Sequence, residues 1–378
     1  MKIFNRKQRR AALSALAIVP LALIATGCTT TQTQETTEEG PANVAGGEPL
    51  SIEELCGTEP IRIAHVAGFG GNTWRQIAEA EVADELGQCD NVTYEYAQAD
   101  GDLQTYISLI NSYSAQGFDG IVTYVDFGDQ ALSALRNAFE AGTVVVPYIG
   151  IPETGEVGVD YNGYARYDFE GEGAIMANWI AENSEDGATV IFTGGLEGGS
   201  PSSVALYDAL KAENEALGEP FTVLNDQPIP SNWDPAYMQR AMTGILAEYP
   251  DFDVWVSDYG AADLGGLRAL VQAGVEVPTL VTSATDNALG CFWLENNDPA
   301  SPSFEMMTMD GTHSTARVAV RKTLAAVNGL PDNEPERVEL FKFIDTVAGD
   351  LPTCRDDLPP DADLSSSLSE DQLKAVFN

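Results

Sequence analysis

The clearest fold signal in the sequence is the stretch IRIAHVAGFGGNTW at residues 61–74. Its first seven residues form an apolar run of strand length, and the glycines after it lead into a helical pattern at 74–87. A strand that turns directly into a helix is the building unit of a parallel sheet with helices on both faces. The rest of the chain should then alternate in the same way.

This alternation continues along the chain. Further strands are predicted at 92–97, 120–125 and 144–149, with helices near 103–116, 129–141 and 170–184. After a break at 150–169, the predicted strands are 188–193, 221–225, 254–257 and 278–282, the helices lie near 202–216, 235–248 and 261–273, a strand–helix pair spans 304–329, and a last strand spans 337–347. Because these units are too many for one sheet, the fold class is α/β with two doubly wound parallel-sheet lobes.

The first 27 residues are predicted to be a lipoprotein signal peptide. A basic start (KIFNRKQRR), the short apolar run AALSALAIVPLALIA and small residues are typical of a secretory signal rather than a membrane-spanning helix. Cys28 follows two small residues, which resembles a bacterial lipobox with Cys28 lipidated, although Ala25 stands where Leu is preferred. Residues 28–55 are then a flexible tether. The alternative is a soluble protein cleaved near Gly27.

The chain is strongly acidic. It has 19 Lys and Arg residues against 58 Asp and Glu residues, a formal charge of −39. Such a surface repels phosphate backbones, so a nucleic-acid partner is excluded. The charge otherwise indicates only solubility.

Four cysteines follow Cys28, and in an exported protein they can form disulfides. In a strand–helix unit the helix returns the chain to the sheet edge where the strand began. Cys56, which precedes the first strand, should therefore lie near Cys89, which follows the first helix. Three connectivities are open, and this argument favours Cys56–Cys89 with Cys291–Cys354.

Several longer stretches add a more specific signal. They are IRIAHVAGFGGNTW, SAQGFDGIVTYV and EAGTVVVPYIG, followed by YDFEGEGAIMANWIAE, NWDPAYMQRAMTGILAEYPDFDVWVSD and LGGLRALVQAG. In this order and spacing the chain resembles type I periplasmic binding proteins of the ribose/autoinducer-binding group, the substrate-binding lipoproteins of ABC transporters. The resemblance covers roughly residues 58–350. It implies two lobes joined by three crossovers, with an N-terminal lobe of 56–155 plus 288–330 and a C-terminal lobe of 156–287 plus 331–378.

The resemblance also implies a ligand in the cleft between the lobes, beyond the carboxyl ends of the strands. A sugar needs apolar faces for its C–H patches and polar groups for its hydroxyls. Trp74 and Trp233 are expected to stack on its two sides. The other expected ligand-binding residues are Asn72, Thr73, Tyr124, Asp126, Phe127, Asp168, Asp234, Asp258, Tyr259, Asp286, Asn287 and Asp310. A loop carboxylate of this kind can equally be solvated or cap a helix.

Two arginine positions of the ribose-type proteins have no counterpart. The chain reads Pro147-Tyr148-Ile149-Gly150 where they carry an Asp-Arg pair, and GGSPSSVALYD where they carry an Arg at a helix start. The expected cleft is therefore acid-rich and lacks Arg, which removes the bidentate donors for neighbouring hydroxyls. A polyol, another carbohydrate or a cationic small molecule all fit this expectation.

A dinucleotide-binding enzyme is a weaker interpretation. The loop Gly68-Phe69-Gly70-Gly71-Asn72 lies between a strand and a helix, but Thr73 replaces the third Gly of the G-x-G-x-x-G pattern. Nicotinamide cofactors are also not expected outside the membrane. His65 is expected to be a core residue, and neither histidine forms a metal cluster with the cysteines. We therefore expect no cofactor and no metal.

A hydrolase is the other enzyme class considered. Ser200, Asp258 or Asp286, and His313 follow the chain order of an α/β-hydrolase triad, but no G-x-S-x-G surrounds Ser200.

The sequence thus predicts an extracytoplasmic, lipid-anchored and monomeric solute-binding protein. It closes on a small polar ligand, a sugar or polyol, and delivers it to an ABC permease without chemistry. The alternatives are a surface ligand sensor subunit of the same fold and a secreted α/β hydrolase.

Overall fold

The computed structural model describes residues 47–70, 72–185 and 187–377. The first sheet has the strand order β2-β1-β3-β4 with all pairs parallel. Its strands are β1 (Ile61–Ala67), β2 (Val92–Gln98), β3 (Gly120–Tyr124) and β4 (Val144–Tyr148). The connecting helices are α2 (Thr73–Leu86), α3 (Leu103–Ala115), the 3₁₀ turn η1 (Gly128–Ala131) and α4 (Leu132–Glu140), and α1 (Ile52–Cys56) precedes them. Buried apolar residues fill β1 and β3, as expected for strands covered on both faces.

The second sheet has the order β12-β10-β9-β8-β6-β7. Its strands are β6 (Ala188–Thr193), β7 (Phe221–Val223), β8 (Val254–Ser257), β9 (Thr279–Ser283), β10 (Met306–Asp310) and β12 (Phe341–Asp345). The associated helices are α5 (Phe169–Asn183), α6 (Pro201–Ala216), α7 (Pro235–Glu248), α8 (Gly260–Ala273) and α9 (Asn287–Asn296). The edge strand β12 runs antiparallel to β10, and the other pairs are parallel. The predicted α/β fold with two parallel-sheet lobes is confirmed.

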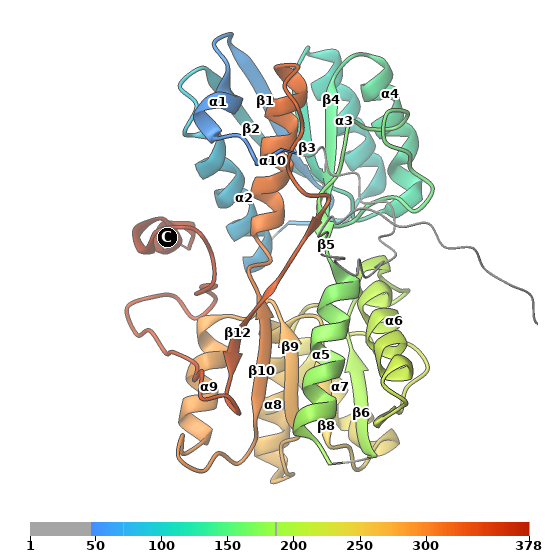
Figure 1. Ribbon diagram of the computed structural model, residues 1–378, viewed down its shortest axis with the longest axis vertical. Coiled ribbons are helices and arrows are strands. Elements are labelled where there is room, and N and C mark those ends of the chain that lie inside the picture. The colour runs from blue at the N-terminus through green and yellow to red at the C-terminus, as the bar shows by residue number, and fades with distance from the viewer. Residues whose placement is uncertain (1–46, 71, 186, 378) are drawn as a thin grey trace, which may run out of the picture. The chain divides into compact units, whose positions relative to one another are not determined.

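The chain passes between the two sheets three times. The first passage joins β4 to α5 and contains β5 (Arg166–Tyr167), and the second joins β10 to α10 (Ser314–Val327). The third leaves α10 through β11 (Arg337–Val338), which pairs with β5, and enters β12. Figure 1 shows α10 beside α2 and the first sheet although these segments are far apart in sequence. The three predicted crossovers are present.

The lobe boundaries need two corrections. β10 pairs with β9 and β12, so residues 288–310 belong with the second sheet and the return to the first sheet occurs at 311–313. The final helix α11 (Glu370–Val376) packs on α2 of the first lobe rather than on the second lobe. Apolar periodicity identifies these segments as strand or helix, but only their backbone and packing partners decide to which lobe they belong.

Both predicted disulfides are present. Cys56 and Cys89 have Cα atoms 5.3 Å apart, and Cys291 and Cys354 have Cα atoms 4.5 Å apart. Within the described residues, no helix is long and apolar enough to cross a bilayer.

The expected leader and tether are largely untested by the structure. The signal peptide and Cys28 lie outside the described residues. The tether ends earlier than residue 55, because α1 begins at Ile52 and buries Ile52 and Leu55 against α10 and its neighbours.

Candidate ligand-binding pocket

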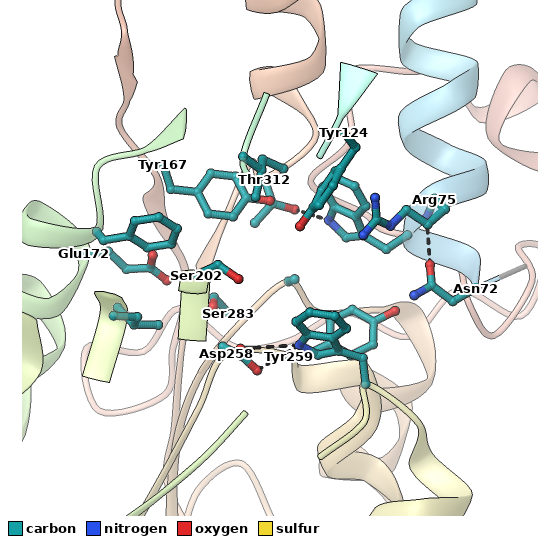
Figure 2. Close-up of a pocket in the computed structure, with 16 residues that line it drawn as sticks. Asn72, Arg75, Tyr124, Tyr167, Glu172, Ser202, Asp258, Tyr259, Ser283 and Thr312 are labelled. Carbon is teal, nitrogen blue, oxygen red and sulfur yellow. Dashed lines mark hydrogen bonds between the residues drawn. The ribbon is translucent and has the colours of Figure 1, made fainter. Parts of the chain in front are cut away.

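A cavity opens at the carboxyl ends of the strands of both sheets (Figure 2). The space free of protein atoms inside it, part of which is open to solvent, amounts to about 580 Å³. Its walls come from the end of β3, from loops and helix starts after β1, β4, β6, β7, β8, β9 and β10, and from the passage through β5 into α5. The lining residues are Asn72, Trp74, Arg75, Tyr124, Ile149, Tyr167, Phe169, Glu172, Ser202, Leu206, Trp233, Asp258, Tyr259, Ser283, Ala284 and Thr312.

Two tryptophans contribute apolar walls. Trp74 Nε1 donates to Thr312 Oγ1 at 2.9 Å, and its ring stacks on His313 with centroids 4.7 Å apart. Trp233 Nε1 lies 3.3 Å from both carboxyl oxygens of Asp258. Because both indole N–H groups donate within the protein, the rings offer a ligand apolar surface rather than a donor.

The loop that carries Trp233 has an uncommon backbone. Asn232 and Trp233 both have positive φ, 50° and 48°. The Ser231 hydroxyl accepts the Trp233 amide at 3.2 Å, and Asn232 Oδ1 accepts the Glu197 amide at 2.8 Å. A bulky residue in the left-handed region is strained and persists where its surroundings hold it. The loop therefore aims the indole into the cavity at a cost in conformational energy.

Arg75 is the basic side chain of the cavity wall. It lies in the first turn of α2, where Asn72 Oδ1 accepts its amide at 2.9 Å and caps the helix. Its Nη2 is 2.6 Å from Asp126 Oδ1, and its Cζ lies 3.4 Å from the centre of the Tyr124 ring. Burial lowers the pKa of Arg75, but Asp126 and the nearby phenols more than offset this and raise it above its usual value. Arg75 is thus a cation at every physiological pH.

Two carboxyl groups face the same cavity from the second lobe. Burial is the main cause that raises the pKa of Glu172 to about 8. The Ser283 hydroxyl lowers this pKa, and the nearby carboxylates Asp258, Asp310 and Asp168 raise it further. Burial also raises the pKa of Asp258 to about 6, although Ser203 and Trp233 donate to it. The two acids therefore differ in charge near neutral pH, with Asp258 mostly ionised and Glu172 mostly protonated.

Six of the fourteen expected ligand-binding residues line the cavity. They are Asn72, Trp74, Tyr124, Trp233, Asp258 and Tyr259. Thr73 lies just outside it, where its hydroxyl is bonded to the Tyr259 side chain. Asp126 sits behind the wall, where it holds Arg75 and accepts the Phe69 amide at 3.0 Å.

The other six residues are placed in structural roles outside the cavity lining. Phe127 packs against Phe69 and Tyr106. Three carboxylates stand at helix N-termini, with Asp234 accepting the Tyr237 amide, Asp286 accepting the Leu289 amide and Asp168 preceding α5. Asn287 bonds backbone of the C-terminal segment, and buried Asp310 accepts from Thr285. Short polar residues at the start of a helix cap its free amides, which explains the positions of Asp234 and Asp286.

The structure adds lining residues that sequence reasoning missed. The expectation of a cleft without Arg is corrected by Arg75, which follows Trp74 directly and so shares its helix turn. Glu172, Tyr167 and Phe169 come from the region of the first crossover. The remaining additions are Ile149, Ser202, Leu206, Ser283, Ala284 and Thr312. The signal for Arg75 was present in the sequence, since a basic residue beside an expected binding tryptophan is itself a candidate.

The geometry does not assemble the hydrolase triad. Ser200 Oγ bonds Ser202 Oγ at 3.0 Å. His313 Nδ1 lies 2.8 Å from Asp363 Oδ2, and its Nε2 donates to the Trp74 carbonyl at 3.1 Å. Both ring nitrogens are thus engaged away from Ser200, so His313 is not placed to activate that hydroxyl.

The glycine loop also lacks the features of a phosphate site. The Phe69 amide, which would face a phosphate, is bonded to the Asp126 carboxylate instead. A fixed negative charge there repels a pyrophosphate. Among the described residues, no group of His, Cys, Asp and Glu is arranged to hold a metal ion.

Comparison with known proteins gives a family assignment. The model of the family described as periplasmic binding protein domain matches residues 63–329, well over half of the chain. No curated protein sequence matches this chain.

Solved structures with the same fold include a glucose-galactose binding protein, GanP, from Geobacillus stearothermophilus, with 16% identity, a TM-score of 0.60, and coverage of 78% of this chain and 100% of that chain. A Caulobacter myo-inositol binding protein bound to myo-inositol has 18% identity, a TM-score of 0.62, and coverage of 75% and 94%. A Mycobacterium smegmatis protein in complex with β-D-fucofuranose has 18% identity, a TM-score of 0.63, and coverage of 76% and 92%. With the two sheets, the three crossovers and the cavity at their strand ends, these findings show that the chain belongs to the periplasmic binding protein domain family.

Proposed function

We propose that this chain is the extracytoplasmic solute-binding protein of an ABC importer, with a sugar or polyol as its ligand. It holds the ligand in the cavity and presents it to a membrane permease. It is proposed to act as a monomer and to catalyse no reaction. The structural relatives named above bind sugars or an inositol according to their descriptions, which supports this ligand class.

The observation that carries the proposal is the composition of the cavity wall. Trp74 and Trp233 supply flat apolar surfaces, while Arg75, Asn72 and Asp258 supply donors and acceptors. A sugar presents the matching pattern, with C–H patches on its ring faces and hydroxyls around its rim. The cavity closes over groups from both lobes, so a bound ligand contacts both and favours their approach.

A thermal-shift screen of hexoses, pentoses, deoxysugars and polyols, followed by titration calorimetry, tests the proposal. Ligand at ~1,000 times its dissociation constant adds ~4 kcal/mol to the folded state, which raises the melting temperature by several degrees. We expect stabilisation by at least one sugar or polyol and saturable binding of one molecule per chain. No binding across these compounds, with binding of amino acids, nucleosides or polyamines instead, would contradict the assigned ligand class.

The lipid anchor is a separate part of the proposal. Cys28 follows a basic start and a short apolar run, the pattern of a lipidated leader. Cells that express the full chain should retain it in the membrane fraction and label it with a fatty-acid analogue. Cys28→Ser should abolish the label and release the protein, and continued labelling of this variant would refute the anchor.

A further inference from the structure

Two buried polar atoms at the cavity lack a hydrogen-bond partner within the described part of the chain, Arg75 Nη1 and Glu172 Oε1. Their residues are 5% and 3% exposed, and both line the cavity. They come from α2 and α5 and lie on opposite sides of the cavity in Figure 2. Burying a polar atom without a hydrogen-bond partner is unfavourable. Two such atoms on residues that line one cavity make these side chains candidates for contact with a ligand.

The surroundings of Glu172 are anionic. Asp258 after β8, Asp310 at the end of β10 and Asp168 before α5 all raise its pKa. Asp263 on α8 adds another buried carboxyl near Asp258. Like charges this close disfavour ionisation of each further group.

The cations near this end of the cavity already have partners. Arg337 on β11 lies 3.6 Å from Asp168 and 3.3 Å from Glu170, and Arg166 on β5 lies 3.0 Å from Glu170. Arg75 across the cavity is matched by buried Asp126. Among the described lining residues, Arg75 is the one basic side chain. Within residues 47–70, 72–185 and 187–377, Glu172 therefore has no cation partner to hold it in the ionised form.

A neutral Glu172 changes what the cavity offers. Ser283 lies close enough to the Glu172 carboxyl to lower its pKa, and Glu172 Oε1 has no hydrogen-bond partner within the described residues. A protonated carboxyl carries one O–H group, so a neutral Glu172 places a hydrogen-bond donor in the cavity wall. Arg75 supplies a second donor group on the opposite side of the cavity.

We propose that Glu172 binds the ligand as an uncharged carboxylic acid and, with Arg75 opposite, selects a neutral polyhydroxy compound that presents an acceptor oxygen to each of them. The inference rests on the proposed function and adds to it the charge of the ligand and the two residues that select it. An acidic sugar is disfavoured by ionised Asp258, since the charge of Arg75 is already neutralised by Asp126. An amino sugar would bind Glu172 well only if Glu172 lost its proton.

The test compares affinities at several pH values for the full-length protein, Glu172→Gln and a matched control, Glu182→Gln. The control removes the same charge from an exposed site on the same helix. The probe is the tightest-binding neutral sugar of the thermal-shift panel, with its 2-amino and uronic acid analogues alongside. Melting temperatures without ligand establish that each variant is folded.

The expected result is specific to Glu172. Glu172 is mostly protonated below its pKa of about 8 and mostly ionised above it. Because the neutral sugar binds the protonated form, wild-type affinity for it should fall about tenfold between pH 7 and pH 9. Glu172→Gln carries an amide donor that does not titrate, so its affinity for the neutral sugar should change much less than that of the wild type between pH 7 and pH 9. Glu182→Gln should behave as the wild type. Titration of Asp258, Asp310 and Asp263 is common to all three proteins and cancels in the comparison.

Three results would overturn the inference. One is tighter binding of the amino sugar than of its parent, with loss of that preference in Glu172→Gln, because Glu172 would then act as an anion. Another is preferential binding of the uronic acid. The third is an identical pH dependence in the wild type and Glu172→Gln. In these three cases the protein still binds a sugar, so the proposed function stands. If no sugar of the panel binds, both this inference and the proposed function are wrong.

Discussion

The two sides of the cavity handle buried charge in opposite ways. On the first-lobe side, the Arg75 guanidinium and the Asp126 carboxylate form a pair 2.6 Å apart, with both side chains almost fully buried. On the second-lobe side, Glu172 and Asp258 are buried without a cation, and burial raises the pKa of each. Burial raises the pKa of Asp126 as well, but Arg75 opposes this shift, whereas no cation among the described lining residues opposes it at Glu172 and Asp258. The comparison suggests that the Arg75–Asp126 pair keeps the first-lobe wall of the cavity rigid, and that Glu172 and Asp258 in the second-lobe wall discriminate between ligands.

The largest effect is expected from breaking the matched pair. Arg75→Met leaves Asp126 buried without its partner, which should lower the free energy of unfolding by about 3–5 kcal/mol. Urea denaturation of the ligand-free protein measures this loss. The double variant Arg75→Met with Asp126→Asn removes both charges and should recover most of the stability. Equal stability of the single and double variants would mean that the pair has no special role.

The two tryptophans should separate stability from binding. Trp74 is 8% exposed, bonds Thr312 and stacks on His313, so Trp74→Ala should cost about 3–5 kcal/mol of stability in addition to affinity. Trp233 is only partly buried, and Trp233→Ala should mainly weaken ligand binding, by about 1–3 kcal/mol. Denaturation and calorimetry on the same samples check both. Full affinity in both variants would show that neither indole ring contributes to ligand binding.

Glu172→Gln tests the contrast between the two sides of the cavity through the stability of the ligand-free protein. Because the folded-state pKa of about 8 lies above the unfolded value, the folded state holds the proton more tightly. The contribution of Glu172 to stability is complete below about pH 4.5 and is lost as the pH rises toward 8. The variant should therefore be more stable than the wild type at pH 7, by about 1–3 kcal/mol. Thermal unfolding across this pH range tests the sign, and a less stable variant would contradict it.

The smallest effect is expected at Asp234, a residue next to the binding tryptophan but outside the cavity lining. Its Oδ1 accepts the Tyr237 amide at 2.8 Å and caps α7. Asp234→Ala should lower stability by about 1 kcal/mol and leave affinity nearly unchanged. Asp234→Asn, which preserves the capping oxygen, is the control. A large loss of affinity in either variant would restore Asp234 to the ligand site.

Much of the fold followed from local pattern. The apolar run at β1, the glycine-rich turn and the helix after it already specify a strand–helix unit, and its repetition specifies parallel sheets. The Cys56–Cys89 bond followed because a helix returns the chain to the edge where its strand began. Parts of the site followed for the same reason, since Asp258 directly follows β8, Trp74 lies at the start of the helix after β1, and strand ends meet at one edge.

Other features depend on contacts between distant segments. The placement of β10 in the second sheet depends on its pairing with β9 and β12. Glu172 reaches the cavity because the chain crosses between sheets just before α5, and Arg75 does so because its helix turn faces the same opening. Periodicity in the sequence reports which faces of an element are buried and which ends carry polar residues, because these follow from repeat geometry along one segment. It cannot report which segments meet, so the pairing of Arg75 with Asp126, and the absence of a cation beside Glu172 among the described residues, arise only when the chain has folded.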